Sequence, residues 1–237
     1  MPEKQPSGEY RTKQQAHPEP PSHPIVVCIC GMLAAGKSTL ARAIAEYWRP
    51  APVLAFDDYA QYTRWPTDLQ RWVRGGADPA LVSNSRLRDD LDALVNGRHV
   101  RHPLTQADLV PSPLVLLEDP FGRTRPDIRD LIDFVLFIDL PADLSVVRLV
   151  RRSLLQSPPD CSPNAAEDSS AFLAKRVEAT ARWLEHYLAH RQMYVGADLL
   201  DPIRKSADAV LDGEKPQDEI RADAISHMEN WLGTPCS

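Results

Sequence analysis

The chain has 237 residues, of which 43% are hydrophobic, and its net charge is −6. This length and apolar content predict one sizeable α/β domain, and the negative charge disfavours general electrostatic binding to nucleic acid or to an anionic membrane. No apolar run approaches the roughly 18 residues of a membrane helix, and no apolar signal segment begins the chain, so we expect a cytoplasmic protein.

Three regions follow from composition along the chain. Residues 1–24 hold six prolines among polar residues and predict a disordered tail. Residues 25–213 are expected to form the domain. Residues 214–237 are expected to form a C-terminal helix and tail.

A glycine-rich loop at residues 31–39 is the strongest motif. It reads Gly-Met-Leu-Ala-Ala-Gly-Lys-Ser-Thr, which fits a glycine, four residues, then Gly-Lys-Ser. In such a loop backbone N–H groups surround a triphosphate, Lys37 reaches its β and γ groups, and the Ser38 hydroxyl holds Mg²⁺. A buried strand predicted before the loop and a helix predicted after it supply the required context. The predicted nucleotide contacts are Gly31, Ala34, Ala35, Gly36, Lys37, Ser38 and Thr39.

Four more strands are predicted beyond the one that precedes the loop. They cover residues 53–56, 114–117, 134–138 and 209–211. Strands and helices alternate, which predicts right-handed crossovers and a parallel sheet.

Six helical segments are predicted as well. They lie at residues 40–48, around 87–94, at 126–131, 141–155, 170–194 and 220–231. On the long helix, Leu173, Val177, Ala181, Leu184 and Leu188 form one apolar stripe. Residues 157–168, with three prolines, are expected to be a mobile loop.

Acidic residues end two of the strands, where open α/β sheets bind ligands. Glu118 ends the third strand and is the candidate second ligand for Mg²⁺, unless it merely ends the strand. Asp57 and Asp58 end the second strand, where a carboxylate can take the proton from an attacking hydroxyl, which is typically worth ~10²–10⁴ in rate. Helix capping is the alternative for Asp58.

Three arginines on the helix at 141–155 are candidates for mobile positive charge. Arg148 and Arg152 share one face of that helix, and Arg151 lies beside them. They look like a lid that closes on a transferring phosphate, where a cation can supply ~10³–10⁵ in turnover. The alternative is a solvated helix face.

Other residues carry weaker signals. Trp65 and Trp72 could stack on an aromatic substrate, although packing is the better interpretation. Arg123 could bind a substrate oxygen or lie on the surface. His186 and His190 stand one helical turn apart, as metal ligands do, but solvated positions fit them better.

The ordered set of these motifs resembles the uridine kinase-like family of P-loop kinases. The set is residues 31–39, Phe56-Asp57-Asp58-Tyr59, Glu118, and residues 137–139 leading into the three arginines. Residues 202–211 also look like that family's segment near the adenine. The resemblance covers about residues 25–213, and the group includes uridine-cytidine kinases, nicotinamide riboside kinases, phosphoribulokinases and one type of pantothenate kinase.

The resemblance implies a P-loop NTPase fold, a three-layer sandwich with a five-stranded parallel sheet and an arginine-bearing lid. It implies ATP and Mg²⁺ as cofactors, with Ser38 and Glu118 serving the metal. The catalytic residues would be Asp57 as the base, Lys37, Arg148 and Arg152. Arg151 and Lys205 would join the loop in binding the nucleotide, and the substrate contacts would be Asp57, Asp58, Tyr59 and Arg123.

The sequence therefore predicts a kinase that phosphorylates a hydroxyl of a small molecule, first of all the 5′-hydroxyl of a nucleoside. Uridine-cytidine kinases hold the nucleobase with a Pro-x-Tyr-Asp segment, whereas residues 103–108 here contain no tyrosine. The alternatives are a gluconate- or shikimate-type kinase and a nucleotide-binding regulatory protein without catalysis. A GTPase is disfavoured, since the chain has no Asn-Lys-x-Asp for guanine. We expect neither nucleic acid nor membrane as a partner, and the sequence does not indicate the oligomeric state.

Overall fold

The computed structural model describes residues 23–48, 50–155, 169–191 and 196–233. At its centre, these residues form a five-stranded parallel sheet in the order β2-β5-β1-β6-β7. The strands are β1 (Ile25–Gly31), β2 (Val53–Ala55), β5 (Leu114–Glu118), β6 (Phe134–Asp139) and β7 (Ala209–Asp212). The predicted α/β fold with a five-stranded parallel sheet is confirmed. The predicted tail and the proline-rich loop lie outside the described residues.

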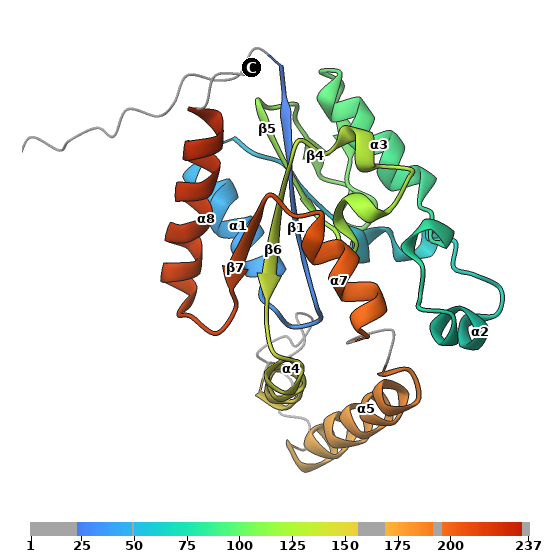
Figure 1. The fold of residues 1–237 in the computed structure, drawn as a ribbon. Helices are drawn as coiled ribbons and strands as arrows, with labels where there is room; N and C mark the ends of the chain where they lie inside the picture. The colour runs from blue at the N-terminus through green and yellow to red at the C-terminus, as the bar shows by residue number, and fades with distance from the viewer. Residues whose placement is uncertain (1–22, 49, 156–168, 192–195, 234–237) are drawn as a thin grey trace, which may run out of the picture.

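Helices cover both faces of the sheet. Figure 1 shows α1 (Lys37–Tyr47) and α8 (Gln217–Leu232) on one face, with α3 (Ser85–Val95) and α7 (Ala197–Lys205) on the other. Alternate residues of β1 point to opposite faces, so Val27 and Ile29 join the core under α1 and α8, while Cys28 and Cys30 join the other core. This double burial explains the uninterrupted apolar run of the strand.

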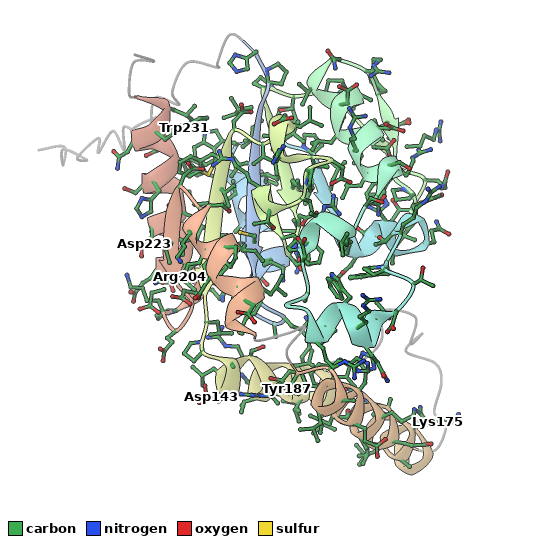
Figure 2. The ribbon with its side chains drawn as sticks, turned by 45° about the vertical axis from the view of Figure 1, so that its right-hand side comes forward. Asp143, Lys175, Tyr187, Arg204, Asp223 and Trp231 are labelled. Atoms are coloured by element: carbon green, nitrogen blue, oxygen red, sulfur yellow. The ribbon has the colours of Figure 1, made fainter. Side chains whose placement is uncertain are left out.

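Helices α4 (Ala142–Leu155) and α5 (Ser169–Ala189) lie beyond the carboxyl ends of the strands. They meet through polar groups: the hydroxyls of Ser153 and Thr180 are 2.6 Å apart. Figure 2 shows Tyr187 where α5 passes α4, and Lys175 toward the outer end of α5.

The predicted apolar stripe of the long helix does not form the contact between α5 and α4. Leu173, Val177 and Leu188 are exposed, whereas Thr180 and Tyr187 are buried, as judged from the side chains of α5 that the structure describes. Among the described residues, α4 is the main neighbour of α5. The contact is polar because the hydroxyl and carbonyl oxygen of Ser153 on α4 form hydrogen bonds with Thr180 and Arg176 on α5.

Several short elements were not predicted individually. They are the 3-10 helices η1 (Phe56–Tyr62), η2 (Pro79–Leu81), η3 (Gly122–Thr124) and η4 (Arg129–Leu131), helix α2 (Leu69–Arg74), and the strands β3 (Val100–Arg101) and β4 (Asp108–Leu109). Phe56, predicted to end a strand, instead begins η1, and the helix predicted over 126–131 is only the turn η4. In the described ranges, no helix has the combination of length and apolar character needed to cross a bilayer.

Gly31 sits where the end of β1 passes closest to β6. Its φ is +135°, and a Cβ built there would lie 2.6 Å from the carbonyl oxygen of Ile138. Gly97 offers a matched comparison, since its φ is +72° but nothing lies within 4 Å of its Cβ position. A side chain at Gly31 must therefore clash as well as strain the backbone.

We expect Gly97→Ala to lower the free energy of unfolding by ~1–2 kcal/mol, because only backbone strain applies. Gly31→Ala should cost roughly 1–3 kcal/mol more, because the backbone of β6 must also shift. Urea unfolding of both variants measures this difference. Equal losses would show that Gly31 is not sterically restricted.

Candidate active site

The glycine-rich loop at residues 31–39, called the phosphate loop from here on, leaves the N-terminus of α1 without a side-chain cap. Gly36 is the residue before the helix, so no side chain caps it, and the first turn contains no acidic residue. By contrast, the side chains of Asp68 and Asn84 accept backbone N–H bonds at the starts of α2 and α3. The uncapped N–H groups and the helix dipole together form a site for an anion.

The loop backbone adopts conformations that favour glycine. The φ angles of Ala34 and Gly36 are +56° and +103°. A Cβ at Gly36 would lie 3.1 Å from the amide group of the Gln217 side chain, so glycine leaves room for that side chain beside the loop. A left-handed alanine is uncommon, and strain of this kind is concentrated at ligand-binding sites.

Ser38 and Glu118 lie against each other across the loop. The Ser38 hydroxyl donates to Glu118 Oε1 at 2.9 Å. The register of β1 with β5, in which Ile29 pairs with Glu118, brings this carboxylate to the loop. Lys37 Nζ donates to the carbonyl oxygen of Met32 at 3.0 Å, so the ammonium group lies inside the loop.

The charges of the site are partly withdrawn from water. Burial lowers the pKa of the Lys37 amine, while Glu118 and Asp57 raise it. Burial also raises the pKa of Glu118, while Ser38 and Lys37 lower it. Because the groups are desolvated, their interactions with a charged ligand are stronger than they would be in water.

Two cavities share Leu33, Lys37, Asp57 and Glu118. The larger cavity measures about 740 Å³ and is lined by residues of the phosphate loop, of α4 and of the segment after β7. Its lining is Leu33, Ala34, Gly36, Lys37, Ser38, Thr39, Arg42, Asp57, Glu118, Arg148, Arg151, Arg152, Glu214, Lys215, Pro216 and Gln217. The smaller measures about 250 Å³ and is mostly apolar. Its lining is Gly31, Met32, Leu33, Lys37, Phe56, Asp57, Trp65, Glu118, Pro120, Phe121, Leu199, Leu200 and Ile203.

The three arginines of α4 lie on the larger cavity, opposite the loop. Arg148 donates to the carbonyl oxygen of Gly213 at 2.9 Å, which connects α4 to the end of β7. Arg151 and Arg152 are exposed and line the same cavity. The arrangement concentrates positive charge across from the uncapped start of α1.

Five predicted site residues line neither cavity: Ala35, Asp58, Tyr59, Arg123 and Lys205. Ala35 is buried, and its backbone N–H donates to the carbonyl oxygen of Met32 at 3.3 Å. Asp58 contacts the ring of His102. Tyr59 is completely buried, and its hydroxyl donates to Asp90 at 3.1 Å. Arg123 forms an ion pair with Asp208 at 2.7 Å and donates to backbone carbonyl groups. Lys205 is exposed at the end of α7. Their surroundings give each of them a structural contact or an exposed position.

Several known proteins are similar to this chain in sequence. The chain is 26% identical over 207 residues to the uridine kinase of Chloroflexus aurantiacus and 27% identical over 206 residues to that of Chloroflexus aggregans, in each case over 81% of this chain and 88% of the relative. It is 27% identical over 146 residues to the uridine kinase of Alkaliphilus metalliredigens, over 56% of this chain and 70% of the relative. The chain resembles the uridine kinases.

No protein-family model matches the chain. Among solved structures, the crystal structure of TT1252 from Thermus thermophilus matches 90% of this chain and 100% of its own, with a TM-score of 0.46 and 20% identity, too weak a likeness to bear on the fold. The uridine kinase-like resemblance predicted from the motifs is thus confirmed by sequence similarity to curated relatives.

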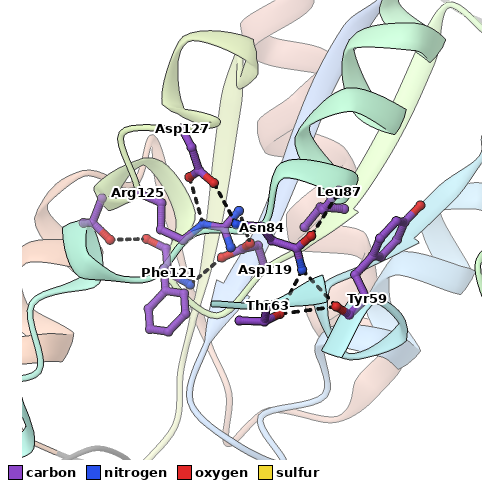
Figure 3. Close-up of polar contacts among 9 residues, drawn as sticks. Tyr59, Thr63, Asn84, Leu87, Asp119, Phe121, Arg125 and Asp127 are labelled. Atoms are coloured by element: carbon purple, nitrogen blue, oxygen red, sulfur yellow. Dashed lines mark hydrogen bonds and ion pairs between the residues drawn. The ribbon is translucent and has the colours of Figure 1, made fainter. Parts of the chain in front are cut away.

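A buried ionic cluster, which sequence reasoning missed, supports the segments that carry the carboxylates of the candidate site (Figure 3). Arg125 is fully buried, with its guanidinium 3.5 Å from Asp119 and 3.3 Å from Asp127. Its carbon Cζ lies 5.2 Å from the ring centre of Phe56. Since Asp119 follows Glu118 and Phe56 precedes Asp57, the cluster holds together the segments that carry both site carboxylates.

Asn84 extends this polar network to η1 and α3. Its amide nitrogen donates to the carbonyl oxygen of Tyr59 and to the Thr63 hydroxyl, and its oxygen accepts from the Leu87 N–H. The Asn84 backbone N–H donates to Asp127. From the sequence, Asn84 could be predicted only as a residue that caps the start of a helix. No local pattern indicates that it is connected through Asp127 to the buried Arg125.

His102 is a second residue that the sequence did not single out. Its Nδ1 accepts from the backbone N–H groups of Leu104 and Thr105, at 3.3 and 3.2 Å. Nε2 must then carry the ring hydrogen, which it donates to Asp58 Oδ2 at 3.2 Å. Asp58 is therefore held by the β3–β4 hairpin, and its neighbour Asp57 faces the cavities.

Arg125→Met should lower the free energy of unfolding by about 3–5 kcal/mol, because it leaves Asp119 and Asp127 without their cation. Burial raises the pKa of Asp119 above its unfolded value, and Arg125 opposes this rise. The free energy of unfolding therefore falls as the pH rises from the pKa of Asp119 in the unfolded chain to its higher pKa in the folded protein. Loss of Arg125 would raise the folded-state pKa further, so the fall would extend over a wider pH range.

Urea unfolding at about pH 5 and about pH 7 tests this, and the loss should be larger at the higher pH. The matched control is Arg129→Met, because Arg129 is exposed and 3.7 Å from an exposed Asp130. That variant should change stability by less than about 0.5 kcal/mol. A loss independent of pH, or one no larger than the control's, would contradict the assigned role.

Two variants of His102 separate its two contacts. His102→Gln can still donate to Asp58, whereas His102→Asn can still accept from the hairpin N–H groups. We expect Asp58→Ala to cost roughly 1 kcal/mol more in the wild-type and Gln backgrounds than in the Asn background, because only the first two have a contact to lose. Urea unfolding measures these values, and the same cost in all three backgrounds would exclude the pair.

Proposed function

We propose that this chain is a Mg·ATP-dependent kinase that transfers the γ-phosphoryl group to a hydroxyl of a small molecule, with the 5′-hydroxyl of a nucleoside as the first candidate. The observation that supports it is the meeting of two cavities at Lys37, Asp57 and Glu118. The larger cavity is lined by the uncapped start of α1 and by arginines, which suits an anion, and the smaller cavity is mostly apolar. The curated relatives named uridine kinase support the same reaction class.

The nucleotide would bind in the larger cavity. The backbone N–H groups of the loop and Lys37 would bind the β and γ phosphates, and Arg148, Arg151 and Arg152 would offset the charge of the transferring group. Oxygen ligands of the kind that Mg²⁺ prefers are present at Ser38 and Glu118, whose side chains already lie together. The bound metal would neutralise charge on the phosphates.

The acceptor hydroxyl would enter from the smaller cavity and meet Asp57. Its oxygen forms the new bond to phosphorus, the bond from phosphorus to ADP breaks, and the proton passes to the Asp57 carboxylate. Asp58, held by His102, would help to position this segment. The cytoplasmic location and the absence of nucleic-acid or membrane partners stay predictions from the sequence.

Asp57→Asn should reduce phosphoryl transfer by ~10²–10⁴, because the base is lost, while Mg·ATP binding persists. ADP release measures the first and calorimetry the second. Asp130→Asn is the control, since it makes the same change at a side chain that is 90% exposed. Lys37→Ala should weaken both binding and transfer. Near-normal turnover of Asp57→Asn would remove Asp57 as the base.

A further inference from the structure

The smaller cavity is charged at one end only. Among the described residues that line it, the charged ones are Lys37, Asp57 and Glu118, which belong to the reacting end. The remaining lining is apolar, from Phe56 and Trp65 on one side to Leu199 on α7. A ligand that reaches the reacting end must therefore place the rest of its body against apolar side chains.

Three aromatic rings hold each other in a fixed arrangement there. Phe56 meets Trp65 and Phe121 edge to face, with ring centres 6.1 and 5.8 Å apart. The backbone beside Trp65 is held by paired hydrogen bonds between Arg64 and Ser83. Such edge-to-face contacts fix ring orientation without covering every face.

Trp65 keeps a large accessible surface within this cluster. It is 42% exposed, whereas Phe56 and Phe121 are each 5% exposed. Trp72 contrasts with it, because that indole is buried and donates to the carbonyl oxygen of Asp78. Of the two tryptophans that the sequence singled out, Trp72 is a core residue and Trp65 offers a surface to a ligand.

The charge distribution of the described residues disfavours an anionic acceptor, because the cation that lines the smaller cavity, Lys37, also lines the larger one. The cations Arg148, Arg151 and Arg152 line the larger cavity but not the smaller one. Arg125 lies behind Phe56, fully buried and already paired with two carboxylates. A phosphate or carboxylate on the acceptor would be desolvated beside Asp57 and Glu118 without a cation of its own.

We propose, as a consequence of the kinase function above, that the acceptor is an uncharged alcohol that carries a flat ring. The ring stacks on Trp65, and its edge is not recognised through hydrogen bonds to side chains of the cavity. A site that reads a substrate by buried hydrogen bonds rejects an analogue lacking them by ~10⁴-fold or more, whereas an apolar site discriminates by ~10–200-fold at most. The ring edge should therefore matter little to this enzyme.

The first experiment compares acceptors by ADP release. Uridine and cytidine have nearly the same size but exchange donors and acceptors along one edge, and we expect their kcat/KM values to differ by less than roughly tenfold. Gluconate, shikimate, pantothenate and a phosphorylated pentose should each be at least about tenfold worse. A preference above ~10³ between the two nucleosides, or an anionic acceptor as the best substrate, would overturn the inference.

The second experiment tests Trp65 directly. Trp65→Ala should raise the KM for the acceptor by about 5- to 150-fold, the range of stacking contributions, and leave the KM for ATP unchanged. Trp65→Phe should retain most of the affinity. Leu81→Ala removes an apolar side chain that is 59% exposed and lies outside both cavities, and it should change neither constant. An unchanged acceptor KM in Trp65→Ala would contradict the stacking contact.

Calorimetry separates this inference from the proposed function. If Mg·ATP does not bind, the kinase proposal fails. If Mg·ATP binds but no uncharged ring alcohol binds in its presence, the acceptor inference fails while the nucleotide site stands.

Discussion

The parallel pairing of β1 with β5 and β6 is the constraint on which the site depends. Pairing with β5 aligns Ile29 with Glu118, so the carboxylate reaches the phosphate loop. Pairing with β6 brings Gly31 against Ile138, where only a glycine fits, and starts the loop at that point. Because β1 is central and its neighbours come later in the chain, the loop lies at a switch point of the sheet, where α/β proteins bind ligands.

Polar groups buried away from water hold the segments beside the smaller cavity in place. The Arg125 cluster joins the end of β5 to η1, and Asn84 joins η1 to α3. Buried ion pairs contribute little net stability compared with apolar packing, but removing one partner is costly. We therefore infer that the cluster serves mainly to fix the relative positions of these segments.

The two sides of the site differ in charge and in the contacts that hold them. The larger cavity is lined by three arginines on α4, a helix beyond the sheet that contacts the body through Arg148 and Gly213 and through Ser145 and the carbonyl oxygen of Leu33. The smaller is lined by aromatic rings that hold one another edge to face. An anion and an uncharged ring would thus be sorted to opposite sides of Lys37, Asp57 and Glu118.

Local patterns were enough to predict the core strands, the acidic residues at their ends and the position of the glycine-rich loop between β1 and α1. A strand buried on both faces needs a continuous apolar run, and a phosphate loop needs glycines, Lys37 and Ser38 in a fixed order, so each is readable without its neighbours. The position of Glu118 beside the loop followed from the general geometry of parallel sheets.

Other features were decided only by tertiary contacts. The two tryptophans look alike in the sequence, but packing buries Trp72 and leaves Trp65 on a cavity. Asp119 and Asp127 are close to Arg125 in the chain, but only packing against Phe56 brings the three together in the core. Asp58 meets His102 through a hairpin that is too short to carry a periodic pattern. Burial and charge pairing are properties of the assembled chain. The sequence alone therefore determined the glycine-rich loop between a strand and a helix, whereas the fold determined the shape and polarity of the smaller cavity.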